Sequence, residues 1–100
     1  MLASLEVART RPDRRRGLLG RDSVDGALLL TPARSVHTIG MRFPIDVAWL
    51  DDDLIVLRTT CMPRNRVSRP VLRARSVLEA EAGSFARWGL VVDDHLDLGD

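Results

Sequence analysis

The segment DVAWLDDDLIVLRTT, residues 46–60, decides the fold class. Its first five residues place Val47 and Trp49 on one face of a strand, because side chains alternate along extended backbone. Three consecutive aspartates at 51–53 then favour a tight turn. Residues 54–60 are rich in aliphatic and β-branched side chains, which are typical of a returning strand. The segment therefore predicts a β-hairpin with an acidic turn.

Short strands are expected on both sides of this hairpin. Apolar runs bounded by glycine, proline or serine predict strands or extended segments at residues 2–7, 27–31, 36–39, 71–81, 90–92 and 95–98. In the segment 71–81, Val77 and Glu79 are expected on the face opposite to Leu78.

Two helical segments interrupt the strands. Thr10 is a good helix N-cap, and Pro12 in the first turn suits a helix over residues 11–19 that ends at Gly20. A short helical turn is expected near residues 84–88, with Ser84 as its cap. Closely spaced strands without long helices between them predict a mainly-β fold, either a compact, jelly-roll-like sandwich or a partly closed barrel.

Composition limits the classes of function. One hundred residues predict a single domain over residues 1–100. Fifteen basic and fourteen acidic residues nearly cancel, so no nucleic-acid or membrane partner is expected. A lone cysteine, Cys61, supports neither a disulfide scaffold nor a zinc site. No signal peptide or bilayer-spanning run is visible, so a cytoplasmic location is expected, and no cofactor or metal is predicted.

Every basic residue is arginine, and two groups of arginines stand out. In the run 14–16, neighbouring side chains diverge by about 100° around a helix. The run is therefore interpreted as a solvated helix surface rather than one patch. Arg64, Arg66 and Arg69 form a second group in the predicted loop 61–70, where they could contact a partner protein.

The segment HTIGMRFPID, residues 37–46, is the most unusual part of the chain. It combines a titratable ring, a hydroxyl, a thioether and a carboxylate with a glycine and a proline that disturb regular pairing. One interpretation is a small polar pocket floored by Met41 and Phe43. The other is that Thr38 and Asp46 satisfy backbone N–H groups of irregular loops while Met41 fills the core. His37 fits either interpretation.

Complete catalytic motifs are missing from the sequence. Cys61 and either histidine could form a nucleophilic pair only if folding joined them, and no Gly-x-Ser-x-Gly elbow exists. The acidic residues 93–97 do not match calcium-loop spacing. These residues are interpreted as a solvated turn.

Three ordered blocks, RGLLGR at 16–21, HTIGMRFPIDV at 37–47 and VLE at 77–79 with Ala82-Gly83, resemble the domain of unknown function family 192. The resemblance covers nearly the whole chain. It implies a compact β-rich fold of sandwich or jelly-roll type with a short helix after the first strand, in a bacterial or archaeal protein. It implies no activity, substrate or cofactor. The matching positions are Gly17, Leu18, Arg21, His37, Thr38, Met41, Pro44, Asp46, Glu79 and Gly83.

Two positions depart from the family pattern. Asp93-Asp94 stands where members often have Gly-Asp, which removes the conformational freedom of the glycine. His37 stands where many members have an aromatic residue, so a mechanism common to the family does not depend on this histidine.

The leading hypothesis is a non-enzymatic binding or accessory domain with a small pocket around residues 37–46, whose partner is a small molecule or a protein. The alternative is a small hydrolase-like or isomerase-like enzyme that uses His37 with Asp46 as its orienting carboxylate. A third possibility is a structural partner domain that uses the basic loop. The candidate binding residues are His37, Thr38, Met41, Asp46, Arg21 and Glu79.

Overall fold

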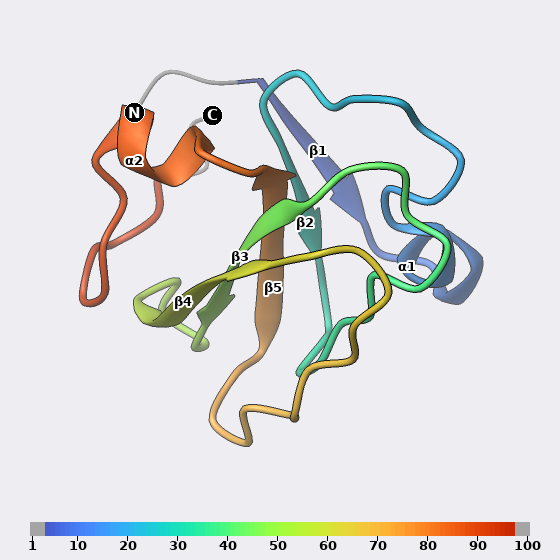
Figure 1. Ribbon diagram of the computed structural model, residues 1–100. Helices are drawn as coiled ribbons and strands as arrows, with labels where there is room; N and C mark the ends of the chain where they lie inside the picture. Colours follow the sequence, from blue (N-terminus) through green and yellow to red (C-terminus); the bar gives the residue numbers. More distant parts are fainter. Residues whose placement is uncertain (1–3, 98–100) are drawn as a thin grey trace.

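The computed structural model describes residues 4–97, which contain five strands in one sheet and two short helices (Figure 1). In chain order the elements are β1 (Leu5–Ala8), α1 (Arg11–Arg16), β2 (Ala27–Leu30), β3 (Ile45–Leu50), β4 (Val56–Met62), β5 (Ser76–Glu81) and α2 (Ser84–Trp88). The mainly-β class, with a short N-terminal helix and a helical turn near residue 84, is confirmed.

The strand order is β1-β2-β5-β3-β4, which places β5 at the centre and leaves the sheet open. β1 and β2 pair in parallel, whereas every other neighbouring pair is antiparallel. A parallel pair needs a crossover connection, and here the crossover contains α1. The five strands form one open sheet covered by helices and loops (Figure 1), and the finer expectation of a sandwich or partly closed barrel is not confirmed.

Both faces of the sheet are apolar and covered. On the first face, Leu28, Val47 and Val77 pack against residues from the α1 crossover and the following loops. On the second face, strand residues such as Leu78 pack against Phe85 of α2 and the C-terminal segment. The predicted opposition of Val77 and Leu78 is therefore confirmed. Burial on both faces explains why β2 and β3 are apolar runs with weak alternation.

The hairpin that was predicted from residues 46–60 is formed by β3 and β4. A carboxylate oxygen of Asp51, Oδ1, accepts hydrogen bonds from the backbone N–H of Asp53 at 2.9 Å and of Ile55 at 3.0 Å, which fixes the acidic turn.

Several element boundaries differ from the prediction. α1 ends at Arg16 rather than at residue 19, because Gly17 has a φ of +48° and leaves the helix. Residues 71–75 form a loop before β5, and among residues 90–97 only His95 makes a β-bridge, with Ile55. Thr10 caps α1 as predicted, by accepting from the Asp13 N–H at 3.2 Å. The predicted strand residues 2, 3 and 98 lie outside the described part of the chain.

Candidate functional site

A carboxyl group lies in the middle of the first apolar face of the sheet. Glu79 is on the central strand β5, and its neighbours in register are Leu28 on β2 and Val47 on β3. Only 3% of Glu79 is exposed, and its Oε1 has no hydrogen-bond partner among residues 4–97. Burial raises the pKa of this carboxyl to about 7. A buried polar group without a partner costs stability, so its presence in a core points to a role beyond packing.

Glu79 lines a cleft of about 290 Å³ between this sheet face and the α1 crossover. We call it the Glu79 cleft. Its other lining residues are Arg11, Arg14, Arg15, Arg16, Gly17, Leu18, Leu19, Leu30, Ala33, Arg34, Ser35, Val36, His37 and Met41. The cleft therefore combines apolar walls, one buried carboxyl and an arginine-rich margin, as small-molecule sites do.

Gly17 brings the end of α1 close to the buried carboxyl. A Cβ atom at this position would lie 3.2 Å from Oε1 of Glu79, and the backbone has a φ of +48° and a ψ of −124°. Residues other than glycine rarely adopt this conformation. Glycine is therefore needed both for the chain reversal after α1 and for the space beside Glu79.

The arginines at the margin of the cleft form no ion pair within residues 4–97. Ion pairs among residues 4–97 involve Arg21, Arg42 and Arg75, none of which lines the cleft. The five arginines that do line it have no carboxylate partner in this part of the chain. Burial alone accounts for the raised pKa of Glu79, and the guanidinium groups do not contribute to this shift. The carboxyl is therefore close to half-protonated near neutral pH.

Three of the predicted site residues meet at this cleft. Met41 is buried in its wall, and His37 is exposed at its margin, where its backbone bridges to Val67. Glu79, the third of these candidate residues, lines the same space. The predicted pocket near residues 37–46 thus lies beside the first half of that segment.

Thr38 points away from the cleft and ties two loops together. It is fully buried; its hydroxyl donates to the carbonyl of Pro63 at 2.6 Å and accepts from the Arg66 N–H at 2.8 Å. The interpretation of Thr38 as a backbone tie is confirmed.

Asp46 has a similar structural role on the opposite face of the sheet. Its Oδ2 accepts from the backbone N–H groups of Gly83 and Phe85, both at 3.0 Å. Asp46, rather than the predicted Ser84, therefore satisfies the first turn of α2. His37 lies on the other side of the sheet, so the predicted His37–Asp46 pair is not formed.

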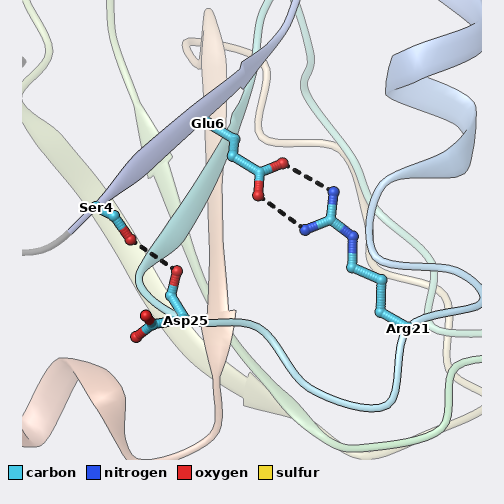
Figure 2. Close-up of polar contacts among 4 residues, drawn as sticks. All are labelled: Ser4, Glu6, Arg21 and Asp25. Carbon is cyan, nitrogen blue, oxygen red and sulfur yellow. Dashed lines mark hydrogen bonds and ion pairs between the residues drawn. The ribbon is translucent and has the colours of Figure 1, made fainter.

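Arg21 is also engaged elsewhere. Figure 2 shows its guanidinium in a two-pronged contact with Glu6 on β1, with distances of 2.8 and 3.0 Å. This contact lowers the pKa of Glu6 and raises that of Arg21. Together with the Ser4 hydroxyl, which donates to the carbonyl of Asp25 at 2.9 Å, it fastens β1 to the loop before β2 (Figure 2). Arg21 therefore holds the crossover in place instead of facing the cleft.

The arginines of α1 were missed as site residues. Neighbouring positions in the run 14–16 do diverge, but Arg11, Arg14 and Arg15 have the i, i+3, i+4 spacing that places side chains on one helix face. Extending the run backward to Arg11 would have shown this common face. Their position over Glu79 depends on the crossover, which has no local signal.

Other kinds of site are not formed in the described residues. Across residues 4–97, no three His, Cys, Asp or Glu side chains gather closely enough to hold a metal ion. Within the same range, no helix is sufficiently long and apolar to cross a bilayer. Cys61 is exposed on β4, and its pKa is raised by partial burial and by the neighbouring Asp46 carboxylate.

Comparison with known proteins extends the resemblance in the sequence. The sequence model of the family DUF192, which is described as an uncharacterised ACR, matches residues 2–98 of this chain. No functionally curated protein matches the sequence.

Two crystal structures share the fold. One is a protein of unknown function from Novosphingobium aromaticivorans DSM 12444, with a TM-score of 0.80 and 20% identity, over 93% of this chain and 73% of that one. The other is described as a "putative transcription regulator" from Sinorhizobium meliloti 1021, with a TM-score of 0.80 and 21% identity, over 93% of this chain and 79% of that one. At these identities the likeness shows the fold alone.

Proposed function

Because the chain belongs to DUF192, a family without a described activity, we propose a function from the geometry of its own site: a non-enzymatic domain that binds a small molecule in the Glu79 cleft. One observation carries this proposal. A carboxyl that is 3% exposed lies on an apolar sheet face, lines a cleft of about 290 Å³ and leaves Oε1 without a partner. A ligand would supply the missing hydrogen bond.

The size of the cleft supports a small molecule over a protein or nucleic-acid partner. Its volume of about 290 Å³ is close to the lower limit of ligand pockets, roughly 300 Å³. Glu79 lies too deep for a macromolecular surface to reach. The description of the Sinorhizobium protein as a transcription regulator concerns that protein, and the net charge of +1 here supports no nucleic-acid role.

A binding role is also favoured over a catalytic one. Glu79 has a pKa suited to proton transfer at neutral pH, but Asp46 is engaged with α2 on the other face. His37 lies at the margin, and none of the ion pairs within residues 4–97 joins it to a carboxylate. The proposal also includes a single domain over residues 1–100 and a cytoplasmic location.

A fragment screen by protein-observed NMR tests the proposal. Fragments of the size of benzene derivatives should shift backbone signals of residues 17–19 and 36–41, which border the cleft. In Glu79→Leu the hits should bind on the order of tenfold more weakly, because a buried hydrogen bond is lost. Glu81→Leu, an exposed position on the same strand, serves as the control. Hits that bind outside the cleft, or that bind Glu79→Leu as tightly as the wild type, would refute the proposal.

A further inference from the structure

We propose that the ligand of the Glu79 cleft is a small amphiphilic organic anion, whose charged group meets the arginines at the margin and whose apolar part lies between Leu18 and Met41. This inference rests on the proposed function and specifies the ligand class.

The charge of the margin selects the sign of the ligand. Arg11, Arg14 and Arg15 project from one face of α1, and Arg16 and Arg34 also line the cleft. Like charges that are gathered in this way repel one another, and in residues 4–97 no acidic side chain pairs with them. Arg14, Arg15 and Arg16 lie in the last turn of α1, where the helix dipole offsets only part of this repulsion. An anionic group bound at the margin would relieve it.

The single acidic group in the cleft does not reverse this preference. Glu79 is one carboxyl among five guanidinium groups, and burial favours its neutral form. In that form it can donate a hydrogen bond to a carbonyl, ether or hydroxyl oxygen of the ligand. A cationic ligand would gain at most one attraction and meet five repulsions.

The walls define the rest of the ligand. Leu18 is 1% exposed and Met41 is 5% exposed, and both belong to the core cluster on this face. The lining side chains between margin and floor are largely apolar. Leu19 and Ala33, which also line the cleft, are only partly buried, so a bare inorganic anion would leave their exposed parts uncovered, whereas a short alkyl or aryl group would cover them.

The charge of the rest of the chain argues for a local preference. The chain has fifteen arginines and fourteen acidic residues, and five of the arginines and one acidic residue line the cleft, so ten arginines stand against thirteen acidic residues elsewhere. Attraction of an anion is therefore directed to the cleft rather than spread over the molecule.

Matched probes test the sign of the charge. Benzoate, phenyl phosphate, benzamide and benzylamine share an aryl group and differ in their polar head. We expect the two anions to shift signals of residues 17–19 and 36–41 and to bind with dissociation constants at least tenfold lower than that of benzamide. Benzylamine should not bind in the cleft. The two anions together also show whether a carboxylate or a phosphate head is preferred.

The outcomes separate the two proposals. If benzamide or benzylamine binds the cleft as well as the anions do, the anion inference is wrong and the binding function stands. If none of the four probes binds there, while inorganic phosphate or chloride does, both proposals fail. Binding of a DNA oligonucleotide across the margin, without signals from Leu18 or Met41, would also overturn the inference.

Two arginine variants, one at the margin and one away from it, test whether the margin charge attracts the anion. Arg15→Gln removes an exposed charge at the margin, whereas Arg87→Gln removes one on α2, across the sheet. We expect Arg15→Gln to weaken benzoate binding on the order of two- to fivefold, and increasing salt to reduce that difference. Equal effects of both variants would contradict the assignment of the charge to the margin.

Discussion

Replacing Glu79 with glutamine should change the pH dependence of stability. The buried carboxyl has a pKa of about 7 in the folded protein, against an ordinary value of 4.5. The folded state thus holds a proton that the unfolded state releases between these two values. Stability should therefore fall as pH rises from about 4.5 to about 7 and level off above it. Glutamine keeps the shape and cannot ionise, so this component disappears.

The size of the effect follows from the two pKa values. The full difference corresponds to about 3 kcal/mol, at about 1.4 kcal/mol for each pKa unit. Part of this loss has already occurred at pH 5, which lies above the unfolded value. Between pH 5 and pH 8, the wild-type free energy of unfolding should therefore decrease by about 2–3 kcal/mol relative to that of Glu79→Gln. Only 3% of the residue is exposed, so solvent screening is small.

Urea denaturation, followed by tryptophan fluorescence at intervals between pH 5 and pH 8, measures this difference. Titration of all other groups is common to both proteins and cancels in the comparison. Glu81→Gln makes the same chemical change at an exposed position on β5 and should follow the wild type. Parallel stability curves for wild type and Glu79→Gln would refute the argument that burial holds this carboxyl neutral.

Three further substitutions test the structural ties around the cleft. Asp46→Ala leaves two N–H groups at the start of α2 without their acceptor, so urea denaturation should show a loss of about 2–3 kcal/mol, and an unchanged stability would contradict the capping role. Thr38→Val removes two buried hydrogen bonds to residues 63–66 and should cost about 1–3 kcal/mol, with faster amide exchange confined to that loop. Gly17→Ala places a Cβ beside Glu79 in a glycine-type conformation, and thermal unfolding should reveal a loss of about 1–3 kcal/mol; a neutral result would show that the turn after α1 relaxes freely.

Much of the fold was predictable from local sequence patterns. The hairpin of β3 and β4 was predictable because its turn signal and its two apolar runs are adjacent in the sequence. The alternation at 77–79 and the cap at Thr10 are likewise local. The single open sheet was not predictable, because β5 inserts between β2 and β3 through pairings that are distant in the chain. Residues 71–75 and 90–97 have strand-like composition, but the first segment forms a loop and the second makes only the single bridge of His95 with Ile55.

The candidate site was predictable only in part. His37 and Met41 were found because the segment 37–46 is irregular. For Thr38 and Asp46, which were also candidate binding residues, the alternative interpretation as backbone ties is the one that the structure shows. Glu79 was a candidate through the family resemblance, but its burial without a partner follows only from its neighbours on β2 and β3. The arginine margin depends on the same long-range placement of α1.

The parallel pairing of β1 with β2 makes the N-terminal strand a remote indicator of the cleft. β1 is held by β2 on one edge and by the Glu6–Arg21 contact, whereas Glu79 lies on the central strand. α1 follows β1 in the chain, so a ligand that contacts both α1 and Glu79 would link the edge strand β1 to the central strand β5. Local opening of β1 would then require breaking that link, so occupancy should slow exchange of amides that the ligand never touches. Protection of the β1 amides from exchange would then report on the occupancy of the cleft.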